Sequence, residues 1–233
     1  MKIAGYQPLT LIDYPGHLAA IVFTQGCPFR CGYCHNPELL PTDREGSLSE
    51  QTVLDRLAED RAMLDGVVVT GGEPTVHPDL PEFLAAIKAL GLKVKLDTNG
   101  VHPRLVEQCL SRQAVDFVAM DIKHTWEKYP LIIGINAPKV VENCRQTFGL
   151  LQASGLPVEF RTTLYSAQHT EDDVLVMAGY LNNLGAYALQ QVRYQKTLNS
   201  DLPESLPFDL QSLKRKIEVS YPNLCVTIKA ESV

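Results

Sequence analysis

Short apolar runs alternate six times with amphipathic segments along this chain, and this alternation most constrains its fold. The apolar runs have the length of buried strands, and most segments between them carry apolar residues at helical spacing. The predicted strands cover residues 18–24, 66–70, 92–96, 115–120, 158–164 and 186–192. The predicted helices cover residues 49–64, 80–90, 103–110, 140–153 and 172–182. Strands joined by helices pair in parallel with right-handed crossovers, so we expect an α/β fold with the helices outside a parallel sheet.

Six units of similar length favour a curved, partial (β/α)6 barrel over a flat sheet. We expect residues 1–233 to form a single domain, because 45% of the residues are hydrophobic and no break in composition divides the chain. The tail, residues 207–229, is predicted to add a helix and a last strand that cover one edge. Flat, Rossmann-type winding of the same elements stays open as the alternative.

The charge balance gives no sign of a polyanionic partner. The chain has 21 basic and 27 acidic residues, so we expect binding neither to nucleic acid nor to an anionic membrane surface. Asp13, Gly16 and two prolines interrupt the first twenty residues, which argues against a signal peptide, and no apolar run reaches membrane-spanning length. A cytoplasmic location is therefore expected, where thiols stay reduced.

Each of the first five predicted strands ends in polar residues or glycines. These strand ends are the cysteine loop 25–37, Thr70-Gly-Gly-Glu-Pro74, Asp97-Thr-Asn-Gly100, Asp121-Ile-Lys123 and Glu159-Phe-Arg-Thr-Thr163. Because the carboxyl ends of parallel strands share one rim of a barrel, these groups are expected to form one active site.

The cysteine loop contains Cys27, Cys31 and Cys34, separated by three and then two residues. Three thiolates at this spacing can bind three irons of an iron–sulfur cube, which normally takes four. The fourth iron would then be left for a small molecule. This pattern predicts an enzyme rather than a simple electron carrier.

Other interpretations of this loop stay open. Cys31-Gly-Tyr-Cys34-His35 matches the attachment motif of c-type haem, but that chemistry requires an exported chain. The three cysteines and His35 could instead hold zinc, although a structural zinc ion would not need the other strand-end motifs. With a cluster present, His35 would lie close enough to donate to a cluster sulfur.

The remaining cysteines and histidines are predicted to have no catalytic role. Cys109, Cys144 and Cys225 fall in apolar patterns and are expected to be buried, with spacing too wide for a second cluster. Electrons would then come from an external flavodoxin- or ferredoxin-like donor. The other histidines are expected to be solvated or to cap helices: His17, His77, His102, His124 and His169.

The Cys-x3-Cys-x2-Cys motif after one strand and Gly-Gly-Glu-Pro after the next resemble the radical S-adenosylmethionine (SAM) superfamily. The resemblance covers nearly the whole chain, so the single domain is expected to be a radical SAM domain. Further motifs resemble glycyl-radical activating enzymes, most of all those of anaerobic ribonucleoside-triphosphate reductases. They are Leu9-Thr-Leu-Ile-Asp-Tyr-Pro-Gly16, Cys34-His-Asn-Pro-Glu38, Asp97-Thr-Asn-Gly100 and Met120-Asp-Ile-Lys123.

The resemblance implies a [4Fe–4S] cluster whose fourth iron is chelated by the amino and carboxylate groups of SAM. Reductive cleavage of SAM would give methionine and a 5′-deoxyadenosyl radical, which removes a hydrogen from a glycine of a partner enzyme. The implied partner is a glycyl-radical enzyme, with anaerobic ribonucleotide reductase the first choice.

The resemblance also assigns SAM-binding roles to strand-end residues. Gly71 and Gly72 would let SAM approach the backbone, and Glu73 would accept from its ammonium group. Asp97 and Asp121 would contact SAM or a monovalent cation beside it, while Lys123 and Arg161 would supply positive charge near its carboxylate or a substrate carbonyl. Three further candidates are Asn99 in the third motif, Tyr33 beside the cluster or adenine, and Gln195 near the ribose.

Two other functions remain as alternatives. A radical SAM enzyme could act on a small molecule, such as a purine or pterin precursor, and would need a closed pocket. A non-catalytic iron–sulfur or zinc module could bind and regulate another protein without SAM.

Overall fold

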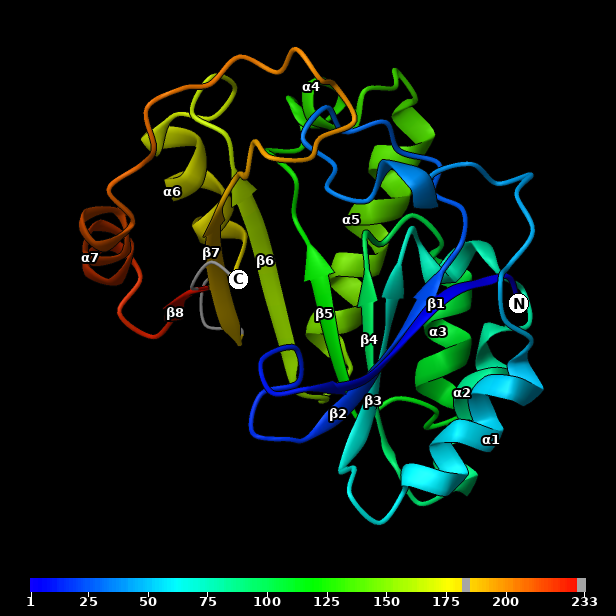
Figure 1. Ribbon diagram of the computed structural model, residues 1–233. Helices are drawn as coiled ribbons and strands as arrows, with labels where there is room; N and C mark the ends of the chain where they lie inside the picture. The colour runs from blue at the N-terminus through cyan, green and yellow to red at the C-terminus, as the bar shows by residue number, and fades with distance from the viewer. Residues whose placement is uncertain (182–184, 230–233) are drawn as a thin grey trace.

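The computed structural model describes residues 1–181 and 185–229. Its eight strands form one sheet in chain order, curved into an open barrel (Figure 1). The first strand, β1 (Ile3–Thr10), runs antiparallel to β2 (Ala19–Thr24), and the later pairings are parallel. The later strands are β3 (Gly66–Gly71), β4 (Lys93–Thr98), β5 (Phe117–Asp121), β6 (Val158–Leu164), β7 (Ala186–Gln191) and β8 (Cys225–Ile228). Within the described residues, β1 and β8 are the two unpaired edges of the barrel.

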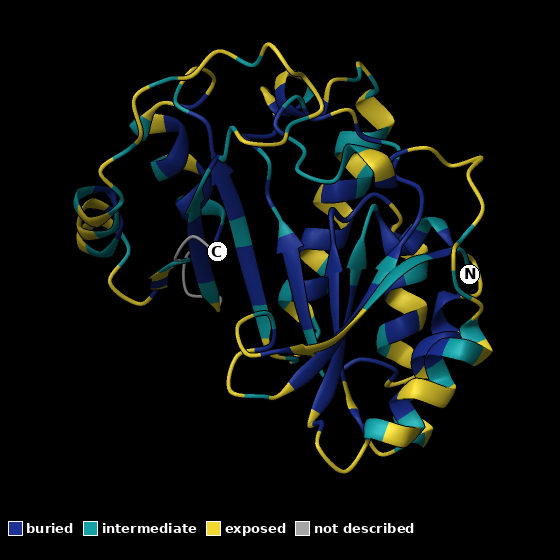
Figure 2. Cartoon of the chain, viewed as in Figure 1, coloured by how far each residue is buried: buried dark blue, intermediate teal, exposed yellow. Residues whose placement is uncertain are grey.

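The helices lie outside the sheet, and their inward faces are buried while their outward faces are exposed (Figure 2). They are α1 (Glu50–Asp60), α2 (Leu80–Ala89), α3 (Pro103–Ser111), α4 (Tyr129–Ile133), α5 (Pro138–Ala153), α6 (Glu171–Tyr180) and α7 (Leu210–Ser220). Two 3-10 turns, Pro37–Leu39 and Pro74–Val76, follow β2 and β3. No helix in the described part of the chain combines the length and apolar character needed to cross a bilayer.

The predicted α/β fold is confirmed, and the six predicted strands correspond to β2–β7. The tail forms α7 and β8, and β8 extends the sheet beyond β7. The predicted helix 172–182 corresponds to α6, although its last position lies outside the described residues.

The prediction missed β1 and the short helix α4. The sequence of β1, Ile-Ala-Gly-Tyr-Gln-Pro-Leu-Thr, lacks apolar alternation and contains Pro8. Proline is tolerated there because β1 is an edge strand and its pairing with β2 shifts register between Gln7 and Thr10.

Strand alternation separates an apolar outer face from a polar inner face. The outward side chains, such as Val94 and Leu96 of β4, join the main core beneath the helices. A small apolar cluster of Tyr14, Ala19, Ile21 and Val68 lies apart from that core. The Tyr14 ring also packs edge-on against Phe117 at 6.0 Å, at the start of β5. This cluster covers the amino-terminal ends of the strands, so the polar residues gather at the opposite ends.

Candidate active site

The cysteine loop begins where β2 ends and is held by backbone hydrogen bonds. Gly26 N donates to Leu39 O at 2.7 Å and Cys27 N to Leu40 O at 3.1 Å, which joins the loop to the 3-10 turn behind it. Arg30 N donates to Ile133 O at 2.8 Å and joins the loop to α4. The loop therefore has a fixed backbone although it lacks regular secondary structure.

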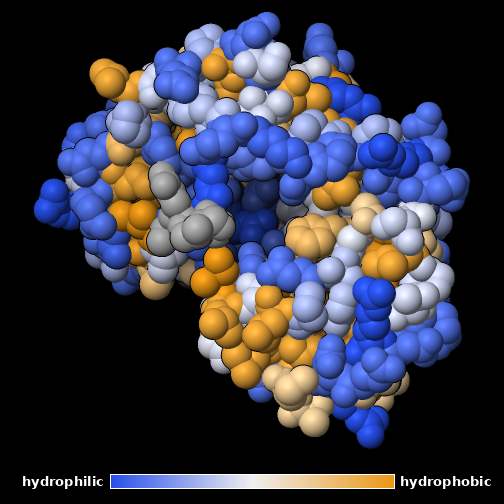
Figure 3. Space-filling model, in the orientation of Figure 1, coloured by the Kyte–Doolittle hydropathy of each residue, from blue (hydrophilic) through white to orange (hydrophobic). Residues whose placement is uncertain are grey.

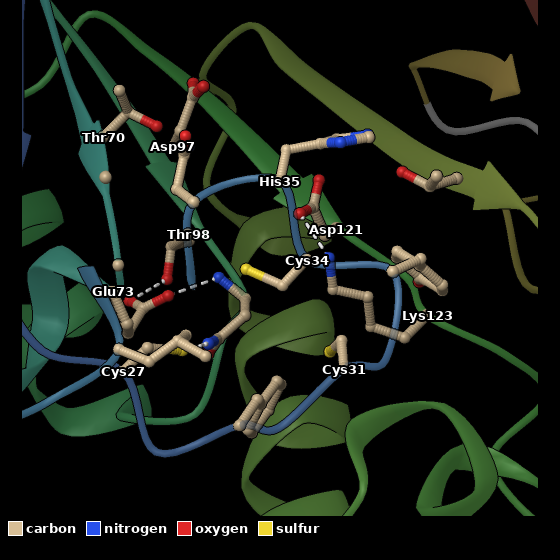
Figure 4. Close-up of a pocket in the computed structure, with 18 of the residues that line it drawn as sticks. Cys27, Cys31, Cys34, His35, Thr70, Glu73, Asp97, Thr98, Asp121 and Lys123 are labelled. Atoms are coloured by element: carbon tan, nitrogen blue, oxygen red, sulfur yellow. Dashed lines mark hydrogen bonds and ion pairs between the residues drawn. The ribbon is translucent and has the colours of Figure 1, made fainter. Parts of the chain in front are cut away.

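All three cysteines of the loop line one cleft of about 830 Å³ at the carboxyl ends of the strands (Figure 4). Their thiols form no disulfide. Burial, reinforced by the charge of Glu73, raises the pKa of Cys27 to about 12, and burial raises the pKa of Cys31 to about 11. Metal binding by these thiols would therefore release protons.

The arrangement of the cysteines fits a polynuclear cluster better than a single ion. Among the described residues, no group of three or more His, Cys, Asp or Glu side chains is close enough together to hold one metal ion. A zinc site needs its ligands to converge at about 2.0–2.3 Å from one ion. The thiolates of a [4Fe–4S] cluster bind different irons and lie farther apart. The Nδ1 atom of His35 lies 3.1 Å from Lys196 O, which leaves its Nε2 atom available.

Gly71 and Gly72 line the cleft, but packing against the backbone is what requires glycine at these positions. A Cβ atom on Gly72 would overlap the carbonyl oxygen of Gly26, and one on Gly71 would overlap the backbone of Thr24. Gly71 also has a φ of 118°, which favours glycine. The two glycines therefore let the end of β3 lie directly against the start of the cysteine loop.

Glu73 joins the end of β3 to the end of β4. Its Oε1 accepts from Thr98 Oγ1 at 2.6 Å, from Thr75 N at 3.1 Å and from the Thr75 hydroxyl, and its Oε2 accepts from Asn99 N at 2.6 Å. Burial raises the pKa of Glu73 in spite of these donors. Glu73 thus has an architectural role that the sequence did not predict, and its contact with an ammonium group of SAM stays a prediction.

Five charged side chains form a continuous network on the inner faces and ends of β4, β5 and β6. Lys95 Nζ donates to Asp97 Oδ1 at 2.5 Å, and Arg161 NH1 donates to Asp97 Oδ2 at 2.9 Å. Arg161 Nε donates to Asp121 Oδ1 at 2.9 Å, and Lys123 Nζ donates to Asp121 Oδ2 at 2.7 Å. Burial opposes the charge on Asp121, but Lys123 and Arg161 outweigh it and lower its pKa. Three cations against two carboxylates leave one net positive charge beside the cleft.

The same contacts bear on the monovalent cation predicted beside Asp97 and Asp121. Every carboxylate oxygen of these two residues already accepts from a cationic side chain. Each oxygen still has a second lone pair, so a monovalent cation beside these residues stays a prediction.

Two other candidates differ in their placement. Tyr33 lines the cleft, is 4% exposed, and its hydroxyl has no hydrogen-bond partner. Gln195 is exposed and does not line the cleft, whereas Gln190 on β7 does and donates to Thr163 Oγ1 at 2.5 Å. The remaining predicted site residues, Asn99, Asp97, Asp121, Lys123 and Arg161, all line the cleft.

The prediction missed several cleft residues. Thr70 and Thr98 belong to motifs that the sequence identified, so their positions could have been predicted from those motifs. Gln190 gave no such signal, because only strand alternation places it on the inner face. Asn99 was predicted, but its amide nitrogen, which lies 3.7 Å from Cys27 Sγ, was not expected to contact a cysteine.

Several expectations for the other cysteines and histidines need correction. Cys109 and Cys144 are buried as predicted, but Cys225 is exposed because its side chain lies on the outer edge strand. His77, His124 and His169 are buried rather than solvated. Each is retained in the interior by hydrogen bonds from its ring to backbone atoms.

A second cavity of about 1270 Å³ adjoins the cleft and shares His35, Arg161 and Gln190 with it. Its other lining residues include Ile12, Asp13, Lys95, Gln191, Arg193, Ile228 and Lys229. Figure 3 shows a hollow in this face of the molecule, bordered largely by hydrophilic residues. Among the described residues, the cleft therefore continues into a larger space lined mostly by polar residues.

Comparisons with known proteins identify relatives that are similar to this chain in sequence. A protein of Methanocaldococcus jannaschii that bears the name "putative glycyl-radical enzyme activating enzyme" is 28% identical over 218 residues, covering 92% of this chain and 89% of that protein. The pyruvate formate-lyase-activating enzyme of Clostridium pasteurianum is 33% identical over 128 residues, and the match covers 53% of this chain and 52% of that enzyme.

The fold is also shared with solved structures. SuiB of Streptococcus suis superimposes with a TM-score of 0.71 at 14% identity, covering 90% of this chain and 48% of SuiB. A radical SAM methyltransferase from Sphaerobacter thermophilus gives a TM-score of 0.66 at 15% identity, covering 95% of this chain and 68% of that one. The sequence model of the radical SAM superfamily matches residues 21–178, from β2 into α6. The chain therefore belongs to the radical SAM superfamily of enzymes.

Proposed function

We propose that this enzyme generates a glycyl radical on a partner protein, with anaerobic ribonucleoside-triphosphate reductase the first candidate. The observation that carries the proposal is that three unpaired cysteines and four polar strand ends meet in one cleft that opens into a second cavity. The similarity to glycyl-radical activating enzymes supports the same conclusion.

Radical SAM enzymes use a [4Fe–4S] cluster and SAM. Cys27, Cys31 and Cys34 would hold three irons here, leaving the fourth for the methionine part of SAM. When bound, this pair of groups supplies a one-electron cleavage of SAM that yields methionine and a 5′-deoxyadenosyl radical. The role of the protein is to bind and orient the cluster and SAM and to shield them from solvent.

The charged network suits the carboxylate of SAM. Lys123 and Arg161 line the cleft and present two cationic groups to it, while Asp97 and Asp121 hold these cations in place. A carboxylate that enters the cleft meets cationic groups whose positions are already fixed, so these side chains need little rearrangement to bind it. Asn99 donates towards Cys27 Sγ, and such hydrogen bonds to sulfur tune the potential of a cluster.

The openness of the site favours a polypeptide substrate. A small-molecule radical enzyme would need to enclose its substrate, whereas this cleft continues past Arg161 into the second cavity. Glycine suits such a substrate because a backbone without a side chain can enter closely, and the radical can delocalise into both neighbouring amides.

Two features bear on the partners of the enzyme. The motifs in the sequence resemble those of activating enzymes of anaerobic ribonucleotide reductases. Two bacterial relatives are instead named pyruvate formate-lyase-activating enzymes. Among the described residues, Cys109, Cys144 and Cys225 are not part of any group of three or more side chains that could hold a metal ion. An external flavodoxin- or ferredoxin-like donor would therefore reduce the cluster, in the cytoplasm.

The first test is partner-independent. Anaerobically reconstituted protein should bind iron and sulfide and, with SAM and dithionite, release 5′-deoxyadenosine. The Cys31→Ala variant should lose both properties, while Cys225→Ala, at an exposed position outside the cleft, should keep both. Bound zinc without SAM cleavage would instead support the non-catalytic module. Rapid SAM cleavage that is stimulated by a purine or pterin precursor would support the small-molecule enzyme.

A further inference from the structure

The chain just beyond β5 is held by three side chains that bind three successive carbonyl oxygens. β5 ends at Asp121, and the next residue still donates its backbone N–H to Arg161 O of β6 at 2.8 Å. The pairs are Tyr129 Oη with Asp121 O at 3.2 Å, Thr162 Oγ1 with Ile122 O at 2.8 Å, and His169 Nε2 with Lys123 O at 2.9 Å. Together they fix the backbone from which the Lys123 side chain enters the cleft.

His169 differs from the other two donors because it can titrate near neutral pH. Its Nε2 binds a carbonyl oxygen, so this nitrogen carries the hydrogen, and its Nδ1 accepts from Tyr165 N at 3.1 Å and lies 3.2 Å from Tyr165 O. His124 stacks on His169, with ring centroids 4.6 Å apart and an interplanar angle of 17°. The His124 ring is fixed in turn, since Nδ1 accepts from Thr125 N at 2.7 Å and Nε2 donates to Gln168 O at 3.0 Å.

The surroundings of the pair favour two neutral rings. His124 and His169 are 0% and 2% exposed, and burial lowers the pKa of each. The charged groups that face them are Asp173, whose Oδ2 lies 3.9 Å from His124 Nε2, and Lys128, whose ammonium group pairs with Asp173 at 2.7 Å. Lys128 thus offsets the one carboxylate that could stabilise an imidazolium ion, and two charged rings in a stack would repel each other.

We propose that His169, held in place by the stacked His124, is a positioning residue that aligns Lys123 with the carboxylate of bound SAM. The inference rests on the proposed function, in which Lys123 meets that carboxylate. Protonation at Nδ1 would cost the bond from Tyr165 N but keep the Nε2 donor to Lys123 O, so the alignment of Lys123 depends on the presence of this donor.

The test compares His169→Ala with His169→Gln, because a glutamine amide can replace the Nε2 donor. His102→Ala is the matched control, since His102 is exposed and its side chain makes no capping hydrogen bond. We expect His169→Ala to bind SAM about tenfold more weakly at pH 8 with unchanged iron content, and His169→Gln and His102→Ala to remain within about twofold of wild type.

Amide hydrogen exchange in the protein without cluster separates this inference from the proposed function. His169→Ala should speed exchange across residues 121–124, and His169→Gln should restore slow exchange. Wild-type exchange rates in His169→Ala, or wild-type SAM affinity in that variant, would overturn the inference. If exchange responds as expected but the reconstituted wild-type protein binds no SAM, the proposed function fails. The role of the hydrogen bonds that hold the carbonyl oxygens of residues 121–123 would still be supported.

Discussion

Arg161 Nε donates to Asp121 Oδ1 at 2.9 Å, which joins the end of β5 to β6 across the inner face of the barrel. The same guanidinium binds Asp97 through NH1, so one side chain links three neighbouring strands. Arginine suits this position because its planar fork can bind two carboxylates in fixed directions. The cleft is therefore bordered by charges whose geometry exists before any ligand arrives.

Removal of Arg161 should destabilise the fold as well as the site. Arg161→Ala leaves the buried Asp97 and the partly buried Asp121 each short of a partner, and we expect the free energy of unfolding to fall by about 3 kcal/mol. Arg161→Lys should recover only part of this loss, because one ammonium group cannot reproduce both contacts. Denaturant titration of the protein without cluster would measure the effect. Arg112→Ala, which removes an exposed pair with Glu82, should cost less than about 1 kcal/mol, and equal losses in the two alanine variants would contradict the account.

Gly72→Ala should prevent cluster assembly, because the new Cβ would overlap the Gly26 carbonyl at the start of the cysteine loop. Iron and sulfide content after reconstitution would measure this directly. Gly149→Ala offers the matched control, since Gly149 lies inside α5 with nothing within 4 Å of an added Cβ. That variant should keep its cluster and gain about 0.5–1 kcal/mol of stability. Normal iron content in Gly72→Ala would show that the loop does not depend on this contact.

Glu73→Gln should weaken the hydrogen bonds that connect the ends of β3 and β4. The amide replaces one acceptor oxygen by a donor, which then faces a donor from Thr75, Thr98 or Asn99. We expect a loss of about 2 kcal/mol in unfolding free energy, together with weaker SAM binding. The exposed Glu82→Gln serves as the comparison. Unchanged stability of Glu73→Gln would mean that its four hydrogen bonds are not needed by the fold.

The sequence predicted the strands and the rim because both depend on local periodicity. Apolar runs marked β2–β7, and the polar residues that follow them had to meet once those strands were parallel. The pairing of Asp97 with Lys95 and Arg161 was not predictable in the same way, because it depends on which side chains of neighbouring strands share the inner face. The role of Glu73 was missed for a similar reason, since its donors come from another strand end.

The edge of the sheet and the border of the cleft were the parts that the sequence predicted least well. β1 lacks alternation because its edge position removes the need to bury one regular face. Gln195 was predicted from its place after the sixth strand, but the chain leaves the barrel beyond Gln191, so Gln190 lines the cleft instead. These errors arise where irregular backbone, rather than strand geometry, determines the direction of a side chain.

Acid should destabilise the protein through its buried histidines. Because burial lowers the folded-state pKa of His124 and His169, their neutral forms favour the folded state above the unfolded pKa of about 6.5. That contribution is lost as the pH falls below about 6.5, by at most about 1.4 kcal/mol per pH unit for each residue. Denaturant titrations between pH 7.5 and 5 would show it, and His124→Gln should reduce the slope. An unchanged slope in this variant would assign the acid sensitivity to other groups.

The central claim is tested most directly by electron paramagnetic resonance of a partner enzyme. Reconstituted protein, SAM and a reductant would be mixed anaerobically with anaerobic ribonucleoside-triphosphate reductase, and in parallel with pyruvate formate-lyase. The account predicts a glycyl radical doublet on one partner, present with the wild-type enzyme and absent with Cys31→Ala. Release of 5′-deoxyadenosine without a doublet on either partner would contradict the assignment to these glycyl-radical enzymes, and no SAM cleavage at all would contradict the role of the three cysteines.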